Sequence, residues 1–376
     1  MKNPIITRIH ELGQSIWLDN LSRKIITSGE LERQITEVGI RGLTSNPAIF
    51  QKAISDGEVY GGAIEELAGQ GLDSKEIYEK LAVSDIQGAT DLFRPIYDTS
   101  GGEDGCVSLE VQPSLVYDAD GTVEEGRRLW KSVSRPNVMI KVPGTREGIP
   151  AITQLLSEGI NINVTLLFSV ERYRDIIDAY LKGLEQRLEK GESIRHVVSV
   201  ASFFLSRIDV MVDPQLQDII DNKPDQADKA KLALGQVALA NAKKAYQLFE
   251  EEFNSDRFKK LEQQGARKQR LLWASTGNKN PDYEELRYVH PLIGPDTVNT
   301  LPQDTLDALK KESADKAAAT VTDDYDKADQ VLSALNDLGL DIEEITDKLE
   351  KEGVDKFEKP FDKLIATVEE QRKEHA

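Results

Sequence analysis

An aspartate, a glutamate and a lysine each close a short apolar run of this chain. They are Asp19 at the end of Ile16–Leu18, Glu110 at the end of Val107–Leu109 and Lys141 at the end of Val138–Ile140. Singly, each is what a strand end usually carries, a solvated charge or a Lys that guards an apolar strand against aggregation. Together in one pocket they would support covalent catalysis, because burial disfavours an ammonium group and a neutral amine attacks ketones to form an iminium.

An iminium is an electron sink, so a C–C bond beside it can break. Two carboxylates can divide the acid and base work if their environments differ. Amide side chains such as Asn46 and Asn163 can hold the hydroxyls of a small sugar. This chemistry needs no metal and no cofactor. A hydrolase with a carbamylated lysine and a metal is the less favoured alternative, because the four histidines form no HxH, HExxH or similar motif. They are His10, His196, His290 and His375.

Eight short apolar runs alternate with longer amphipathic stretches, which predicts βαβ units. The runs are Ser15–Leu18, Gly39–Leu43, Gly105–Val111, Asn137–Val142, Ile160–Leu166, His196–Ala201, Arg270–Ala274 and Arg287–Ile293. Helical patterns include Glu124–Ser134, Gly148–Ser157, Ser169–Gly191 and Lys229–Asn254. Eight units indicate an α/β fold, a closed (β/α)₈ TIM barrel, whose catalytic groups lie at the C-terminal ends of the strands. An open doubly wound sheet is the runner-up, disfavoured because no GxGxxG follows the first strand.

We expect one barrel domain over residues 1–376, with additional helices in two places. A helical insert spans residues 51–100, with helical patterns at Glu58–Ala68 and Ser74–Tyr97. An acidic helical extension, residues 303–376, is expected to pack on the outside of the barrel. Its apolar positions at helical spacing are Val331, Leu332, Leu335, Leu338 and Ile342. A partly disordered charged tail remains the alternative near Gln371–Ala376.

The composition limits the classes of binding partner and the cellular compartment that we expect for this protein. The 376 residues carry a formal net charge of −19, which argues against nucleic acid and anionic membranes as partners. A phosphorylated substrate therefore needs a local basic pocket. The single cysteine, Cys106, fits a reducing compartment. Without a signal peptide or an apolar run of membrane-spanning length, we expect a soluble cytoplasmic protein. The oligomeric state is not fixed by the sequence, and a homodimer is compatible with it.

At these residues the sequence resembles the transaldolase family, within the Schiff-base class I aldolase superfamily. The resemblance rests on Gly42–Pro47 (GLTSNP), Ile140–Thr145 (IKVPGT) and Ile162–Ser169 (INVTLLFS), and it covers roughly Ile16 to Pro302. Three motifs in the expected order make it specific. The length of the insert and of the C-terminal extension resembles a longer subgroup of the family.

The resemblance implies roles for individual residues. Lys141 would be the Schiff-base nucleophile, Asp19 the acid/base for C–C cleavage, and Glu110 would assist carbinolamine formation and dehydration through a water held by Thr165. Dihydroxyacetone would be bound by Asn46, Asn163 and Ser202. Thr44 would lie at the same C-terminal end of the barrel, and Phe204 would shape the pocket. Arg207 would bind phosphate. After the seventh strand, better-known members carry Ser-Phe-Arg, whereas this chain has Ser275 followed by Thr-Gly-Asn-Lys, so Lys279 would replace the missing arginine as a less directional charge.

The implied reaction belongs to the non-oxidative pentose phosphate pathway. A dihydroxyacetone unit would pass from sedoheptulose 7-phosphate to glyceraldehyde 3-phosphate, giving erythrose 4-phosphate and fructose 6-phosphate. Two alternatives stay open. One is a class I aldolase that releases free dihydroxyacetone, and the other is a non-catalytic barrel that binds metabolites or proteins.

Overall fold

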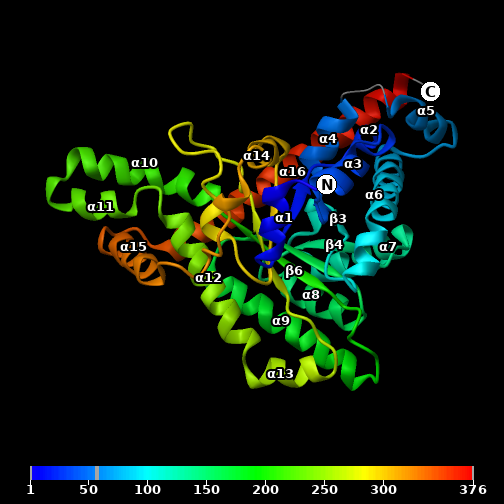
Figure 1. Ribbon diagram of the computed structural model, residues 1–376. Helices are drawn as coiled ribbons and strands as arrows, with labels where there is room; N and C mark the ends of the chain where they lie inside the picture. The colour runs from blue at the N-terminus through cyan, green and yellow to red at the C-terminus, as the bar shows by residue number, and fades with distance from the viewer. Residues whose placement is uncertain (1, 56–58, 375–376) are drawn as a thin grey trace.

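The computed structural model describes residues 2–55 and 59–374, in which eight parallel strands close into a barrel in the order β1 to β8 (Figure 1). The strands are β1 (Gln14–Asp19), β2 (Gly42–Thr44), β3 (Cys106–Glu110), β4 (Val138–Pro143), β5 (Ile162–Leu167), β6 (Ser199–Phe204), β7 (Arg270–Ala274) and β8 (Thr297–Leu301). A helix or helices follow most strands and cover the outside of the sheet. This arrangement confirms the predicted (β/α)₈ barrel.

The helices of the barrel and of the insert are α1 (Pro4–Glu11), α2 (Arg23–Thr27), α3 (Glu30–Arg33), α4 (Pro47–Ser55), α5 (Gly61–Gly69), α6 (Ser74–Thr99), α7 (Ala119–Val133), α8 (Gly148–Ser157), α9 (Val170–Glu189), α10 (Ser206–Asn222), α11 (Ala227–Ala233), α12 (Val237–Phe253) and α13 (Asp256–Gln263). The C-terminal extension forms α14 (Gln303–Leu309), α15 (Tyr325–Asp337) and α16 (Ile342–Glu374). The described residues also form a short π-helix, η1 (Gln34–Val38), and the 3₁₀-helices η2 (Pro113–Leu115), η3 (Pro224–Gln226), η4 (His290–Leu292) and η5 (Ala314–Lys316).

The eighth strand is not where the apolar pattern placed it. The segment Arg287–Ile293 forms turns and η4, because Pro291 lacks the N–H that a central strand must donate. Strand β8 instead occupies Thr297–Leu301, where it pairs with both β1 and β7. Its Thr-Val-Asn-Thr-Leu sequence is half polar, so the strand cannot be recognised as an apolar run.

One predicted helix is also divided. The pattern over Lys229–Asn254 becomes α11 and α12, separated at Gly235, which has a left-handed φ of +63°. A side chain there would begin 2.5 Å from the Tyr283 hydroxyl oxygen, so only glycine fits the turn. In the insert, the helix predicted from Glu58 corresponds to α5, while Glu58 itself lies outside the described residues.

Large side chains fill the interior of the barrel. Trp17 of β1 is fully buried, and a Cβ atom on Gly42 of the adjacent β2 would lie 2.4 Å from its ring. The Trp17 side chain thus occupies the volume that a side chain at position 42 would need. A packed interior leaves the C-terminal end of the strands as the place for a ligand, as is usual for this fold.

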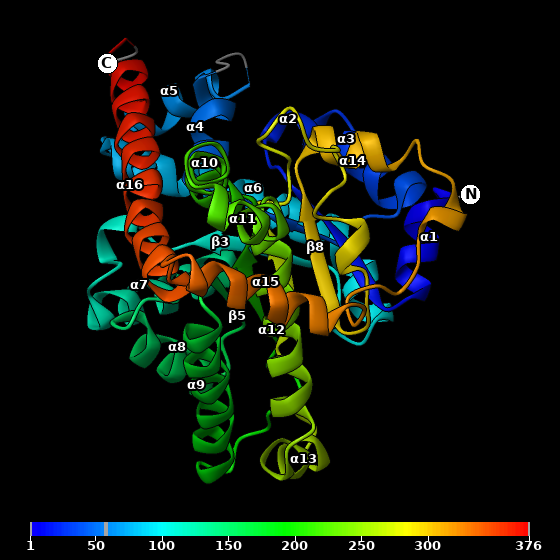
Figure 2. The same cartoon turned by 90° about the vertical axis from the view of Figure 1, so that its left-hand side faces the viewer.

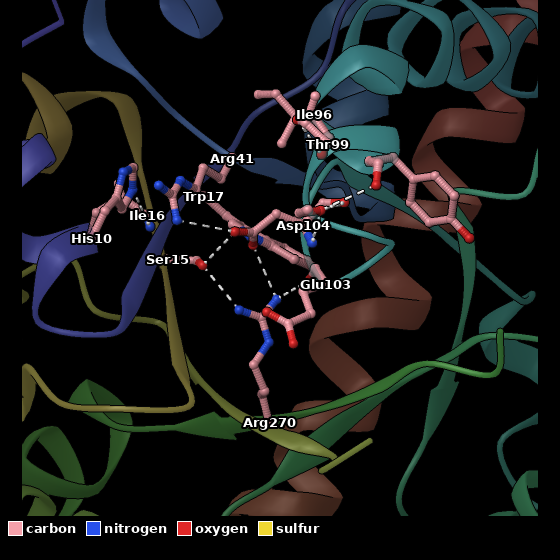
Figure 3. A network of polar contacts seen from close by, with 12 residues as sticks. His10, Ser15, Ile16, Trp17, Arg41, Ile96, Thr99, Glu103, Asp104 and Arg270 are labelled. Carbon is pink, nitrogen blue, oxygen red and sulfur yellow. Dashed lines mark hydrogen bonds and ion pairs between the residues drawn. The ribbon is translucent and has the colours of Figure 1, made fainter. Parts of the chain in front are cut away.

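A buried ion network occupies the opposite, N-terminal end of the barrel (Figure 3). Asp104, just before β3, accepts hydrogen bonds from Ser15 Oγ at 2.9 Å and Arg270 Nη2 at 3.1 Å, and Arg41 Nη1 lies 3.4 Å away. Burial would raise the pKa of Asp104, but Arg270, Ser15 and Arg41 outweigh it and hold this pKa below its ordinary value. The network therefore joins β1, β3 and β7 at the end remote from the C-terminal mouth.

We expect Asp104→Ala to lower the free energy of unfolding by about 3–5 kcal/mol, because it removes the buried carboxylate that pairs with the largely buried Arg270 and accepts the Ser15 hydrogen bond. Urea denaturation would measure this as a lower midpoint at an unchanged slope. Because the folded-state pKa of Asp104 is depressed, its contribution is present above about pH 4 and is lost as the pH falls. Asp91→Ala, which removes an exposed ion pair with Arg135, is the matched control and should change little. Equal losses for the two variants would contradict this assignment.

Helix α16 is the longest helix of the structure and belongs to the C-terminal extension. In Figure 2 it rises along one side of the molecule (red), and its C-terminal half lies beside α4 and α5. Phe361 packs edge-on against Tyr78 of α6, with ring centroids 5.6 Å apart. The extension is thus folded against both the barrel and the insert. Among residues 2–55 and 59–374, no helix is long and apolar enough to cross a membrane.

Candidate active site

The strand register brings the proposed catalytic residues together. Lys141 on β4 is paired with Glu110 on β3 and with Asn163 on β5, so these three residues lie side by side on adjacent strands. On the other side of the barrel, Asp19 of β1 is paired with Thr44 of β2. Asp19, Thr44 and Glu110 are the last residues of their strands, at the end where barrel enzymes carry their reactive groups, and Lys141 precedes the end of β4 by two residues, whereas Asn163 is the second residue of β5.

A cavity of about 230 Å³ opens at this end of the barrel. All but two of the site residues expected from the sequence line it, namely Asp19, Thr44, Asn46, Lys141, Thr165, Ser202, Phe204, Arg207, Ser275 and Lys279. The remaining two, Glu110 and Asn163, are held against the lining by direct contacts with Lys141 and Ser202. The structure therefore brings the whole predicted set into one place, while the role of each residue stays a proposal.

Lys141 is buried between polar partners. Its Nζ lies 3.4 Å from Glu110 Oε2 and donates to the carbonyl oxygen of Ser45 at 3.2 Å, and both side chains of the ion pair are about 5–6% exposed. Burial raises the pKa of Glu110 to about 7, against the opposing effect of Lys141 and with a further rise from Asp19. Near neutral pH, Glu110 can therefore both give and take a proton beside the amine.

This pKa predicts a pH dependence for imine formation. If Glu110 gives the proton that removes the carbinolamine hydroxyl as water, the rate should be highest while Glu110 is protonated. Above about pH 7 the carboxylate predominates, so the rate should fall about tenfold per pH unit. Rapid-mixing measurement of imine formation as a function of pH would show this fall in the rate. The Glu110→Gln variant should not show it. An unchanged pH profile in that variant would remove Glu110 from this step.

Asp19 lines the same cavity as the amine and is held by a hydroxyl group. Thr44 Oγ1 donates to Asp19 Oδ1 at 2.7 Å, and the Thr44 hydroxyl also lies 2.7 Å from that of Thr300 on β8. Burial raises the pKa of Asp19, an effect that Lys141, Thr44 and Lys279 oppose. A fixed carboxyl group with a raised pKa is suited to exchange a proton with a substrate hydroxyl.

Amide and hydroxyl groups line the cavity between the charged residues. Ser202 Oγ donates to Asn163 Oδ1 at 2.7 Å, and Asn163 Nδ2 donates to Ser108 Oγ at 2.9 Å, so this amide is fixed from both sides. Asn46 Oδ1 accepts from the Ile49 backbone N–H at the start of α4. The buried Thr165 hydroxyl has no hydrogen-bond partner among the described residues, which leaves it able to bind a ligand or water.

The other end of the cavity is cationic. Arg207 and Lys279 line it together with Ser275, whose hydroxyl is 3.1 Å from that of Ser206. Arg207 Nη1 is buried and has no hydrogen-bond partner among the described residues, and its guanidinium lies 5.3 Å from the centre of the Phe204 ring. A cation with an unused buried donor is suited to an anionic group such as phosphate.

Two non-glycine residues at this mouth have left-handed backbone conformations. Leu166, directly after Thr165, has a φ of +60°, and Ser275 has a φ of +55°. The pairing of β5 with β6 also shifts its register between Val164 and Leu167. Such conformations cost free energy and are concentrated at functional sites. Here one of them, Ser275, lines the cavity, and the other, Leu166, directly follows Thr165, which also lines it.

Some lining residues were missed by sequence reasoning. Thr300 and Pro302 were overlooked because β8 was placed too early in the chain. Lys356 and Phe357 also line the cavity, although they belong to α16, which was expected only to pack outside the barrel. No motif marks these two residues in the sequence. On an amphipathic helix a Lys is ordinarily read as a surface residue and a Phe as a core residue, so neither suggests a binding site.

Other pockets are larger but lack this chemistry. A cavity of about 340 Å³ between α12 and α15 is lined by Lys243, Arg287 and His290 with Glu284 and Asp324, but none of its lining residues belongs to a strand, and Lys243 Nζ donates to the backbone carbonyl oxygens of Thr320 and Asp323. We assign the candidate active site to the cavity at the C-terminal mouth of the barrel because of the chemistry of its residues and not because of its size. Among the residues described, no group of three or more His, Cys, Asp or Glu side chains is arranged to hold a metal ion.

A buried lysine beside a carboxylate at the C-terminal mouth of a (β/α)₈ barrel is the arrangement expected of an enzyme that works through a lysine imine. Comparison with known proteins gives the family. Residues 16–368 match the model of the Transaldolase/Fructose-6-phosphate aldolase family, so the chain belongs to that family. A transaldolase of Trichodesmium erythraeum is 48% identical over 373 residues, which cover 98% of this chain and 97% of its own. A transaldolase of Saccharopolyspora erythraea is 46% identical over 369 residues, 98% of each chain, and a "Transaldolase 2" of a Nostoc species is 46% identical over 371 residues, 97% of this chain and 96% of its own.

Proposed function

We propose that the protein is a transaldolase that moves a dihydroxyacetone unit through an imine on Lys141. The donor would be sedoheptulose 7-phosphate and the acceptor glyceraldehyde 3-phosphate, giving erythrose 4-phosphate and fructose 6-phosphate in the non-oxidative pentose phosphate pathway. The observation that carries the proposal is the placement of the Lys141 amine 3.4 Å from Glu110, in a cavity that also exposes Asp19. Family membership over nearly the whole chain supports it.

The first half of the reaction is the cleavage of the donor. Lys141 attacks the ketone carbon, and Glu110 moves protons through a water at Thr165 while the carbinolamine loses its hydroxyl. Asp19 then takes the proton of the C4 hydroxyl, the C3–C4 bond breaks, and its electrons enter the iminium to form an enamine. The aldehyde product leaves, and the three-carbon enamine stays on Lys141.

The second half reverses these steps with a new aldehyde. The enamine carbon attacks the acceptor, Asp19 returns its proton to the new hydroxyl, and water hydrolyses the resulting iminium. Asn46, Asn163 and Ser202 would hold the hydroxyls of the dihydroxyacetone unit, with Thr44 orienting Asp19 and Phe204 shaping the wall. Arg207, Ser275 and Lys279 would bind the phosphate. The chemistry requires no metal or cofactor.

The nearest rival is an aldolase that releases dihydroxyacetone, and acceptor dependence separates the two. With fructose 6-phosphate alone, we expect slow or no release of dihydroxyacetone, measured with a coupled glycerol dehydrogenase assay. Addition of erythrose 4-phosphate should start steady production of sedoheptulose 7-phosphate and glyceraldehyde 3-phosphate. Rapid release of dihydroxyacetone without an acceptor would overturn the transferase proposal.

Compartment and assembly are part of the same proposal. A cytoplasmic enzyme fits the single buried cysteine and the sugar phosphate substrates. A homodimer stays a prediction, and light scattering on the purified protein would test it.

A further inference from the structure

Three residues of α16 face the mouth of the barrel, and they share one side of this helix. A Cβ atom on Gly353 would lie 3.0 Å from Leu166 Cδ2 and 3.9 Å from Arg207 Nη1, so the helix backbone passes close to the cationic end of the cavity. Lys356 and Phe357 come three and four residues later and therefore lie on the same helix face. Both line the cavity that contains Lys141. We call Gly353, Lys356 and Phe357 the mouth face of α16.

Contacts outside the cavity hold the mouth face in position. Glu343 accepts a hydrogen bond from Ser169 Oγ at 2.6 Å, and Glu350 lies 3.5 Å from Arg172 Nε. On the C-terminal side, Phe361 packs edge-on against Tyr78. These contacts fix α16 on both sides of the mouth face. The position of the mouth face over the amine therefore does not depend on contacts that its own side chains make.

Phe357 covers the amine. Its ring centre lies 5.5 Å from Lys141 Nζ, and the residue is 9% exposed. After C–C cleavage, the enamine on Lys141 can gain a proton at carbon to give an iminium. Water can then add to the iminium carbon, and the C–N bond breaks to release dihydroxyacetone and the free amine. An apolar ring over the amine slows this loss because it keeps water, the source of that proton, away from the enamine on that side.

Lys356 extends the cationic end of the cavity. It lines the same cavity as Arg207 and Lys279, and its one ion pair among the described residues is with Glu352, one helical turn away at 3.3 Å. An exposed pair of this kind is weak, so the ammonium group can exchange it for a phosphate at little cost. The exchange would add a third cation to Arg207 and Lys279 at this end of the cavity.

We propose that the mouth face of α16 completes the substrate site. Lys356 binds the substrate phosphate together with Arg207 and Lys279, and Phe357 shields the Lys141 adduct so that the three-carbon unit is transferred and not released. The inference rests on the proposed transaldolase function, and it makes the C-terminal extension part of the specificity of the enzyme.

The Phe357 part is tested by the partition between transfer and release. In the full-length protein, Phe357→Ala should raise the dihydroxyacetone released per fructose 6-phosphate cleaved by about tenfold, which corresponds to about 1.4 kcal/mol between the two barriers. Phe357→Leu should retain most of the shielding. Phe361→Ala is the control for helix packing, because Phe361 contacts Tyr78 and does not line the cavity. An unchanged partition in Phe357→Ala, or an equal change in Phe361→Ala, would overturn this part.

The Lys356 part is tested by the Michaelis constant. Lys356→Ala should raise KM for fructose 6-phosphate by about tenfold and leave KM for unphosphorylated fructose unchanged. Lys279→Ala should show the same selectivity, whereas Lys359→Ala, on the exposed side of α16, should not. Equal effects on both sugars, or no effect on either, would remove Lys356 from the phosphate site.

Borohydride trapping of the unmodified protein distinguishes a failure of the proposed role of α16 from a failure of the proposed transaldolase function. If an adduct forms on Lys141 but these variants behave like their controls, only the role of α16 is wrong. If no adduct forms on Lys141, the proposed function itself fails.

Discussion

Replacement of Lys141 by alanine is expected to reduce turnover by roughly 10⁴-fold or more, because the reaction then lacks the amine that forms the imine. Lys141 is the amine that lines the cavity beside Glu110, and its side chain is only 5% exposed. The expected result is loss of both transferase activity and borohydride-trapped adduct. Steady-state assays with sedoheptulose 7-phosphate and mass spectrometry of the treated protein would measure the two effects.

Lys141→Arg is the matched variant for this experiment. It places a cation beside Glu110 but cannot form an imine, so it should be as inactive as the alanine variant while retaining more stability. Circular dichroism and thermal unfolding would show that both variants are folded. Substantial activity in Lys141→Arg would mean that charge, and not covalent catalysis, is what position 141 supplies.

Asp19→Asn is expected to reduce turnover by roughly 10²–10⁴-fold, because C–C cleavage loses its base. The asparagine can still accept the hydrogen bond that Thr44 donates at 2.7 Å, so the local geometry should persist. Imine formation depends on Lys141 and Glu110, so trapping with fructose 6-phosphate should remain largely intact. Single-turnover kinetics would then show normal adduct formation followed by slow cleavage.

Thr44→Val is a useful companion to Asp19→Asn. It keeps the size of the side chain but removes the hydroxyl that contacts Asp19 and Thr300. It should slow cleavage less than Asp19→Asn does. If Asp19→Asn instead abolished trapping, Asp19 would act in imine formation, and the division of labour between the two carboxyl groups would have to be reversed.

The sequence predicts the barrel and most of the site because both depend on local patterns. Seven strands are marked by apolar runs, and the polar residue that ends each run lies at the C-terminal mouth because parallel strands all end at the same side. Lys141, Asp19 and Glu110 could be grouped on that argument alone. The register that pairs Lys141 with Glu110 and Asn163 then follows from closure of the barrel.

The parts that were missed depend on tertiary context. Strand β8 is buried yet half polar: Thr297 accepts a hydrogen bond from Gln14 Nε2 and Asn299 Nδ2 donates one to the carbonyl oxygen of Tyr288, so the strand lacks an apolar signature. Phe357 and Lys356 reach the cavity only because α16 crosses the mouth more than 200 residues after Lys141 in the chain. Nothing in the spacing of residues along α16 distinguishes a helix that packs outside the barrel from one that covers its opening.

Borohydride reduction in the presence of fructose 6-phosphate tests the central claim most directly. Reduction converts the imine to a stable amine, and peptide mass spectrometry then locates the added three-carbon or six-carbon unit. We predict a single modified peptide that carries the adduct on Lys141. An adduct on a different lysine, or no adduct in a protein that is active, would contradict the mechanism.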